Sequence, residues 1–276
     1  MKRVLRFLFG LTLLSIAAQT AHAQSDPGDG DFVTTHGARI YFEQHGEGEP
    51  LLLLHAFGWT GASWDRYLQA LATHYRVIVP DLPGHGRSTY PDTSGVWRID
   101  VVARQMIGLL DALGLGQVRA LGGSAGGVVL LNAATMAPDR FEAIAIVGGT
   151  PYRSAATRDW ILENAPVGAE PDSGSVAMHG AERAALLERQ FRNLGAYYGD
   201  HQLTPDLLNR IAARTLIVHG DNDALIPVSL AWEMYQHIPG AHLWVIPNGG
   251  HVPYRDPANE TIFTQRILEF LGGAWE

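Results

Sequence analysis

Short apolar runs alternate with amphipathic segments along most of this chain, and no other sequence feature constrains its fold as strongly. The run Pro50–His55 contains four consecutive leucines, as expected for a parallel strand buried on both faces. Strands alternating with helices predict an α/β fold with a mostly parallel, doubly wound sheet. Ser63 is the predicted N-cap of the first helix. The other predicted strands are 75–80, 117–121, 141–147, 215–219 and 242–246, and the predicted helices are 63–73, 98–113, 125–136, 228–237 and 257–271.

Two regions depart from this alternation. Residues 32–35 and 39–44 flank His36-Gly37 and predict a β-hairpin before the first leucine-rich strand. Residues 150–212 contain no convincing strand and have helical stretches at 181–194 and 205–211, separated by the Pro/Gly/Ala-rich segment 165–175. About 60 residues make only a marginal core. We therefore expect 150–212 to be a helical cap inserted into a core formed by 32–149 and 213–276.

The N-terminal 23 residues have the pattern of a secretory signal peptide. Lys2, Arg3 and Arg6 form a basic start, residues 7–18 are mostly apolar, and Ala21-His22-Ala23 has the small-x-small form of a cleavage site. The apolar stretch is shorter than the about 20 residues that span a bilayer, so no stable membrane span is expected after cleavage. Residues 24–31 are polar and predict a flexible leader. We expect export, to a periplasm or beyond the cell.

Composition excludes several classes of function. The chain has no cysteine, which rules out disulfides, lipid attachment at cysteine and a thiol nucleophile. Cleavage would leave 253 residues and change the net charge from −8 to −11, which argues against a nucleic-acid partner. The twelve histidines show no His-Glu-x-x-His spacing, and no nucleotide-binding glycine loop follows a strand. We expect a small-molecule substrate, no metal and no cofactor, and leave the oligomeric state open.

The segment Gly122-Gly123-Ser124-Ala125-Gly126-Gly127 follows the predicted strand 117–121 and matches Gly-x-Ser-x-Gly. A serine on a sharp strand-to-helix turn needs very small neighbours, because the strand and the helix approach each other closely. Three fixed positions also occur by chance in a chain with 31 glycines, so the motif needs support from the rest of the sequence.

A serine nucleophile requires a base and an acid that orients the base. Asp221 and Asp223 follow the strand 215–219, and Gly249-Gly250-His251 follows the last strand. The carboxyl ends of parallel strands share one edge of the sheet, so these residues are expected near Ser124. Asp223 and Asp221 are both candidates for the acid, and His251 is the candidate base.

Taken in order, several segments resemble the α/β-hydrolase family, in particular its serine-nucleophile esterase and lipase branch with a helical cap, over essentially the whole mature chain. The resemblance implies Ser124 as nucleophile, Asp223 as acid and His251 as base. It also implies an oxyanion hole formed by the backbone N–H groups of Ala125 and Phe57, although Ala56 stands where relatives have glycine. The segments are His55-Ala-Phe-Gly58, Asp81-Leu-Pro-Gly-His-Gly-Arg-Ser88, Gly122–Gly127, Gly220-Asp-Asn-Asp223 and Gly250-His251.

An exported hydrolase with an apolar cap predicts a carboxylic ester of small to medium size as substrate. Aromatic residues near the oxyanion loop, after the base and in the cap are candidates for the pocket wall. These candidate pocket residues are Trp59, Tyr152, Trp160, Phe191, Tyr197, Tyr198 and Val252.

Other activities use the same triad and stay open. They are lactone hydrolysis, carbon–carbon bond hydrolysis, perhydrolysis and proline iminopeptidase activity, and the last needs acids for a substrate amine, such as Glu163, Glu170, Glu182 or Glu188. Dehalogenases and epoxide hydrolases are disfavoured because their elbow nucleophile is aspartate. A non-catalytic ligand receptor of the same fold is the alternative outside enzymes.

Overall fold

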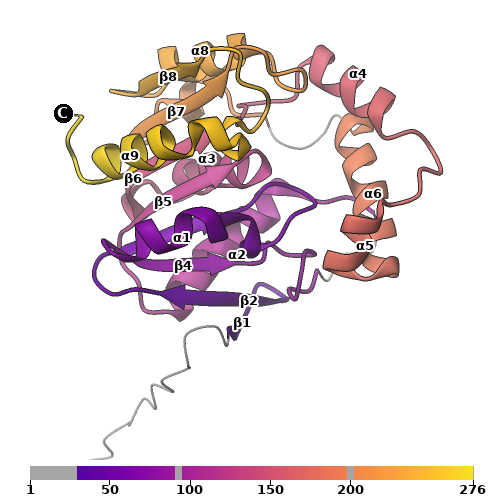
Figure 1. Cartoon of the computed structure of the whole chain (residues 1–276), viewed down its shortest axis with the longest axis horizontal. Helices are drawn as coiled ribbons and strands as arrows, with labels where there is room; N and C mark the ends of the chain where they lie inside the picture. The colour runs from indigo at the N-terminus through magenta and orange to yellow at the C-terminus, as the bar shows by residue number, and fades with distance from the viewer. Residues whose placement is uncertain (1–29, 91–94, 198–201, 276) are drawn as a thin grey trace, which may run out of the picture.

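The computed structural model describes residues 30–90, 95–197 and 202–275, and within them the strands form a single sheet of eight (Figure 1). Their spatial order is β1-β2-β4-β3-β5-β6-β7-β8. β2 pairs antiparallel with β1 and β4, and every other pairing is parallel. The strands are β1 Asp31–Thr35, β2 Ala38–His45, β3 Pro50–Leu54, β4 Arg76–Pro80, β5 Val118–Gly123, β6 Phe141–Val147, β7 Arg214–Gly220 and β8 His242–Ile246. The predicted α/β fold with a mostly parallel sheet is confirmed.

Helices cover both faces of the sheet, as the leucine run in β3 predicts. Leu52 and Leu54 belong to a core shared with α2, α3 and α8, whereas Leu51 and Leu53 belong to a second core shared with α1 and α9. All four leucines are fully buried. In Figure 1, α1 and α9 lie in front of the sheet. These helices are α1 Asp65–Ala72, α2 Ile99–Ala112, α3 Ala125–Met136, α8 Val228–His237 and α9 Glu260–Leu271.

Three of the helices between β6 and β7 form a cap at one end of the sheet, on the right in Figure 1. They are α4 Ala155–Asn164, α5 Ser173–His179 and α6 Ala181–Ala196, whereas the fourth, α7 Pro205–Leu208, packs against α3 and α8 of the core. α4 and α6 pack against each other, and α5 packs against α6. Among the described residues, no helix has the length and apolar character that crossing a membrane requires.

Several predicted boundaries are wrong, for local reasons. Ser63 is no N-cap, because it lies inside a 3-10 turn, η1 Gly61–Trp64, and α1 begins after it at Asp65. The last helix begins at Glu260, after the short turns η3 Pro253–Arg255 and η4 Pro257–Asn259. Another short turn, η2 Pro138–Arg140, leads from α3 into β6. β1 starts at Asp31, one residue inside the predicted leader.

The cap also differs from its prediction in detail. α7 ends at Leu208 rather than 211, and an isolated antiparallel bridge joins Tyr152 to Gln202 in a region predicted without strands. α5 begins inside the segment taken as a separator, because the side chain of Asp172 accepts hydrogen bonds from the backbone N–H groups of Gly174 and Ser175. The predicted signal peptide and residues 24–29 of the leader lie outside the described residues.

Candidate active site

Ser124 occupies a strained turn between β5 and α3. Its backbone φ is 49° and its ψ is −117°, a conformation that residues other than glycine rarely adopt. A Cβ on Gly122 would lie 2.6 Å from backbone atoms of Gly126, and a Cβ on Gly126 would lie 2.3 Å from the carbonyl oxygen of Leu54. The small residues around Ser124 are therefore a steric requirement of the turn.

Two hydrogen bonds join Ser124, His251 and Asp223. Oγ of Ser124 lies 2.8 Å from Nε2 of His251, and Nδ1 of His251 lies 2.8 Å from Oδ2 of Asp223. Because a carboxylate accepts, Nδ1 carries the imidazole proton and Nε2 is free to accept the proton of Ser124. The structure thus brings together the three residues that the sequence assigned to this chemistry.

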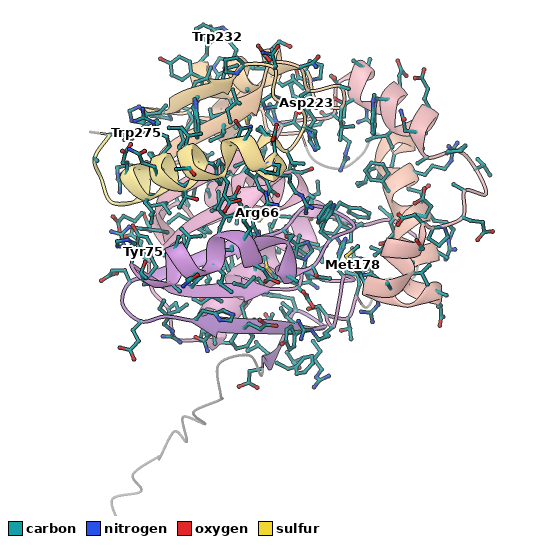
Figure 2. The ribbon with its side chains drawn as sticks, viewed as in Figure 1. Arg66, Tyr75, Met178, Asp223, Trp232 and Trp275 are labelled. Carbon is teal, nitrogen blue, oxygen red and sulfur yellow. The ribbon has the colours of Figure 1, made fainter. Side chains whose placement is uncertain are left out.

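The carboxylate of Asp223 is fully buried, at the end of the sheet nearest the cap (Figure 2). Oδ1 accepts hydrogen bonds from the backbone N–H groups of Leu225 at 2.8 Å and Ile226 at 2.9 Å. Burial alone raises the pKa of Asp223, but the hydrogen bonds from His219 and His251 outweigh it and hold this pKa well below its usual value. Asp223 is thus held ionised, in position to stabilise a positively charged His251.

His219 is a participant that sequence reasoning missed. Its Nε2 lies 3.2 Å from Oδ2 of Asp223 and 2.9 Å from the carbonyl oxygen of Ile226, and its side chain is fully buried. The sequence could have identified His219 as a partner of Asp223, because it lies near the end of the strand that leads to Asp223, four residues earlier. Asp221, the alternative acid, is exposed, and the hydrogen bond of His251 is to Asp223 instead.

Two backbone N–H groups, those of Ala125 and Phe57, are the candidates for an oxyanion hole. Ala125 is the first residue of α3, where N–H groups have no acceptor within the helix. The N–H of Phe57 has no acceptor among the described residues, and both residues line a cavity with Ser124. Ala56 does not have a positive φ. The left-handed position in this loop is Gly58, with φ of 76°, so alanine at 56 causes no strain.

The cavity at Ser124 lies between core and cap and has a volume of about 60 Å³. Its walls are mainly apolar, with Arg153, which is 8% exposed, Thr150 and Thr157 as polar members. The core contributes Phe57, Trp97, Ile99, Ser124, Ala125, Val128, Leu225 and Ile226, and the cap and its entry contribute Thr150, Arg153, Thr157, Ile161, Phe191 and Leu194.

Of the seven residues predicted to line the substrate pocket, Phe191 lines this cavity. The hydroxyl of Tyr152 instead donates to Glu233, at 2.8 Å. Tyr197 is 50% exposed, and Val252 packs against the core shared with α1 and α9. Trp160, in α4, is not part of the cavity wall, and Tyr198 lies outside the described residues. Helical periodicity does not show which side of a cap helix faces the site, and this explains why Trp160 was misassigned.

Trp59, the remaining prediction, lines a different cavity, of about 380 Å³. The four cap glutamates Glu163, Glu170, Glu182 and Glu188 are also absent from the wall of the Ser124 cavity. Within residues 30–90, 95–197 and 202–275, no three His, Asp or Glu side chains are grouped so as to hold a metal ion.

Two other buried histidines support the oxyanion loop. Nδ1 of His55 donates to the carbonyl oxygen of Ala56 at 2.8 Å, and Nε2 accepts from the N–H of Leu82 at 2.8 Å. Burial lowers the pKa of His55 to about 4 and holds that of His85 well below its ordinary value. Both rings are neutral at pH 7, so they act through packing and hydrogen bonds.

Comparisons with known proteins point in the same direction as this geometry. A family model described as alpha/beta hydrolase fold matches residues 49–170, and one described as prolyl oligopeptidase family matches residues 114–275. The chain is 27% identical over 247 residues to the pimeloyl-acyl-carrier-protein methyl ester esterase of Nitrosomonas europaea, covering 79% of this chain and 94% of that protein.

Similarity extends to a carbon–carbon bond hydrolase and to solved structures. The 2-hydroxy-6-oxo-6-phenylhexa-2,4-dienoate hydrolase of Burkholderia cepacia is 26% identical over 268 residues, which are 84% of this chain and 91% of that protein. The crystal structure of a hydrolase from Pseudomonas aeruginosa PA01 superposes with a TM-score of 0.74 at 26% identity, covering 90% of this chain and 100% of that one.

Proposed function

Because this chain belongs to the α/β-hydrolase fold family, we propose that it hydrolyses a carboxylic ester through an acyl-enzyme formed on Ser124. The observation that carries the proposal is the continuous chain from Ser124 through His251 to Asp223, with both hydrogen bonds at 2.8 Å, at the wall of a largely apolar cavity. The relatives reported above are hydrolases, and this agrees with a hydrolytic reaction.

The residues divide the reaction into two halves. His251 takes the proton of Ser124 as Oγ attacks the ester carbonyl, and the N–H groups of Phe57 and Ala125 stabilise the oxyanion. The bond to the leaving alcohol then breaks, and His251 donates its proton to the departing oxygen. Water, activated by the same histidine, releases the acid and restores Ser124. Asp223 holds the ring of His251 in the tautomer that both halves require.

Cavity size limits the acyl group. At about 10–15 Å³ for each water-sized sphere, a cavity of about 60 Å³ has room for only roughly four to six such spheres. The walls are mainly aliphatic and aromatic, so they favour an apolar acyl chain over a charged one. We therefore place this substrate at the small end of the expected range, with an acetyl or propionyl group.

The proposal includes export, which rests on the signal-peptide pattern of residues 1–23. Expression of the full chain in a Gram-negative host, followed by mass determination of the protein in each fraction, tests it. A mature chain that begins at Gln24 in the periplasm or medium supports export, and an uncleaved chain confined to the cytoplasm refutes it.

The catalytic proposal is tested by two measurements on the purified protein and on Ser124→Ala. A fluorophosphonate probe should label the wild type and not the variant, since labelling needs an activated serine. p-Nitrophenyl acetate should be hydrolysed by the wild type and not by the variant. Absence of labelling and of turnover would favour the receptor alternative.

Carbon–carbon bond hydrolysis is the second candidate, because the Burkholderia cepacia relative aligns over 84% of this chain and is named for that reaction. A 2-hydroxy-6-oxohexa-2,4-dienoate substrate, whose absorbance disappears on cleavage, separates the two. Turnover of the dienoate without turnover of any short-chain ester would reverse the ranking.

A further inference from the structure

His179, the last residue of α5, connects the cap to two loops of the core through a half-buried imidazole. Its Nδ1 accepts a hydrogen bond from the backbone N–H of Gly86 at 3.0 Å, and its Nε2 lies 3.0 Å from the carbonyl oxygen of Gly58. Because a carbonyl oxygen accepts, Nε2 carries the ring proton and donates it to Gly58. One imidazole of the cap therefore bridges backbone groups of two different core loops.

Gly58 belongs to the turn that contains the candidate oxyanion donor. The N–H of Trp59 donates to the carbonyl oxygen of Ala56 at 3.2 Å and closes a four-residue turn. Phe57 and Gly58 are its central residues, and Gly58 has a φ of 76°, which favours glycine at this position. The hydrogen bond from the cap therefore reaches the residue directly after Phe57, inside the same turn.

The core holds the two ends of this turn unequally. At its start, the carbonyl oxygen of Ala56 accepts from the fully buried ring of His55 at 2.8 Å. Gly58 has no comparable packing, since a Cβ placed on it would have no atom within 4 Å. Among the described residues, His179 is the one hydrogen-bond partner of the Gly58 carbonyl oxygen. The cap therefore supplies a restraint that the core does not supply at this end of the turn.

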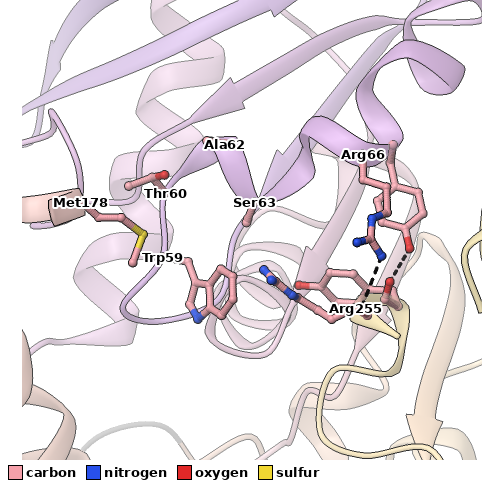
Figure 3. A pocket seen from close by; sticks show the side chains of 9 residues that line it. Trp59, Thr60, Ala62, Ser63, Arg66, Met178 and Arg255 are labelled. Atoms are coloured by element: carbon pink, nitrogen blue, oxygen red, sulfur yellow. Dashed lines mark hydrogen bonds between the residues drawn. The ribbon is translucent and has the colours of Figure 1, made fainter. Parts of the chain in front are cut away.

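The cavity of about 380 Å³ adjoins the same end of the turn (Figure 3). Trp59, which follows Gly58, and Met178, which precedes His179, both line it. The guanidinium of Arg255 lies over the ring of Trp59, 3.7 Å from its centre, so the Trp59 side chain has a contact of its own. The hydrogen bond from His179 acts instead on the backbone, which determines where the N–H groups of the turn point.

A second side chain of the cap contacts the core beside His179 without reaching this turn. Nη1 of Arg183, in the first turn of α6, donates to the carbonyl oxygen of Gly86. Gly86 is thus bonded to the cap twice, through its N–H and through its carbonyl oxygen. Of these two cap side chains, His179 is the one that also bonds Gly58, so the two roles can be separated by substitution.

We propose that His179 is a positioning residue: by holding the carbonyl group of Gly58, it keeps the turn in the shape that directs the N–H of Phe57 toward the oxyanion. This inference rests on the proposed ester hydrolysis and adds a residue of the cap to that site. The oxyanion forms when Oγ of Ser124 bonds to the acyl carbon, the carbonyl electron pair moves to oxygen, and the serine proton goes to His251. Loss of the bond to Gly58 should slow this step without weakening ground-state binding.

The test separates the two hydrogen bonds of His179. The amide nitrogen of a glutamine can reach the place of Nε2 and keep the bond to Gly58, whereas an asparagine amide reaches the place of Nδ1 and keeps the bond to Gly86. With p-nitrophenyl acetate, His179→Asn should lower kcat about ten-fold at unchanged KM, less than the roughly 10²–10³-fold cost of a lost oxyanion donor. His179→Gln should keep most of the wild-type kcat.

A second measurement reports on the oxyanion itself. Trifluoroacetone adds to an activated serine, and its carbonyl oxygen becomes an oxyanion in the same hole. Its inhibition constant should rise in His179→Asn by the factor by which kcat/KM falls, and should change little in His179→Gln. Arg183→Gln is the matched control, because it removes a bond to Gly86 and leaves the bond to Gly58. It should change neither kcat nor the inhibition constant.

The outcomes distinguish this role from the function on which it rests. If the wild type hydrolyses p-nitrophenyl acetate no faster than Ser124→Ala does, the proposed esterase function fails. If the wild type is active and His179→Asn keeps its kcat and inhibition constant, the function stands and the positioning role is refuted. Equal losses in His179→Asn, His179→Gln and Arg183→Gln would also refute it, because any loosening of the cap would then slow the reaction. His179→Ala, which makes neither bond, should match His179→Asn, and thermal melts check that each variant is folded.

Discussion

Replacing Ile161 with alanine should shift the preferred ester toward longer acyl chains. Ile161 is 3% exposed and belongs to the cap wall of the Ser124 cavity, so the change removes three carbons directly from that wall. Each methylene that the enlarged cavity then buries contributes about 0.8 kcal/mol, or roughly four-fold in kcat/KM. Three methylenes set an upper limit of about 60-fold on the change in the hexanoate-to-acetate ratio, and we expect about ten-fold because the walls relax.

The assay is kcat/KM for p-nitrophenyl esters from acetate to octanoate. Leu187→Ala is the matched control, since it removes three carbons from another cap residue that is 3% exposed but does not line the cavity. Both variants should lose about 2–5 kcal/mol of stability. The control should nevertheless keep the wild-type chain-length profile.

Two results would refute this reasoning. A wild type that already prefers octanoate to acetate would show that the cavity of about 60 Å³ does not receive the acyl chain. The same shift in both variants would show that a loosened cap, rather than the local volume at Ile161, determines the profile.

Three further perturbations test other parts of the site. Asp223→Asn should lower kcat by about 10⁴-fold, because the amide can donate to Nδ1 of His251 and favour the wrong tautomer, while urea unfolding shows the fold retained. Buried His55, with a pKa of about 4, takes up a proton when the wild type unfolds below pH 6.5. This uptake lowers the wild-type free energy of unfolding by up to about 3 kcal/mol near pH 4. In His55→Gln, the free energy of unfolding should therefore fall less steeply as the pH drops from about 6.5 to 4. Thermal melts across that range measure the slope, and equal slopes would contradict the assignment. Gly126→Ala should lower Tm sharply or prevent folding, because the new Cβ would lie 2.3 Å from a backbone oxygen. Gly116→Ala is the control, since a Cβ there would have no atom within 4 Å and should leave Tm nearly unchanged. Similar Tm values for the two variants would refute the steric argument.

The sheet could be predicted because its determinants are local and periodic. The leucines of β3 face the two cores alternately, and the shortness of the run, which Pro50 precedes, favours a strand buried on both faces over a buried helix. The turn at Ser124 could also be predicted from the sequence, because the residues that must be small for steric reasons are glycines next to it in the chain. The starts of helices were harder to predict from the sequence. Ser63 lies inside a 3-10 turn that precedes the first α-helix, so it does not cap that helix.

The cavities could not be predicted, because they depend on contacts between residues distant in sequence. Aromatic composition identified Phe191 but could not show that Tyr152 would bond Glu233 across 81 positions, or that Trp59 would line a different cavity, beneath the guanidinium of Arg255. Leu225 and Ile226, by contrast, reach the cavity simply because they follow Asp223, so proximity to a catalytic residue in sequence was the better guide.

The link between cap and catalytic loop shows why these distant contacts matter for function. His179 ends α5 in the cap, accepts from the N–H of Gly86 through Nδ1 at 3.0 Å, and donates through Nε2 to the carbonyl oxygen of Gly58 at 3.0 Å. Gly58 directly follows Phe57, the proposed oxyanion donor. α5 itself packs against α6, and Phe191 and Leu194 of α6 line the cavity at Ser124. One imidazole of the cap therefore bonds the loop of the proposed oxyanion donor, on a helix that packs against a wall of the cavity.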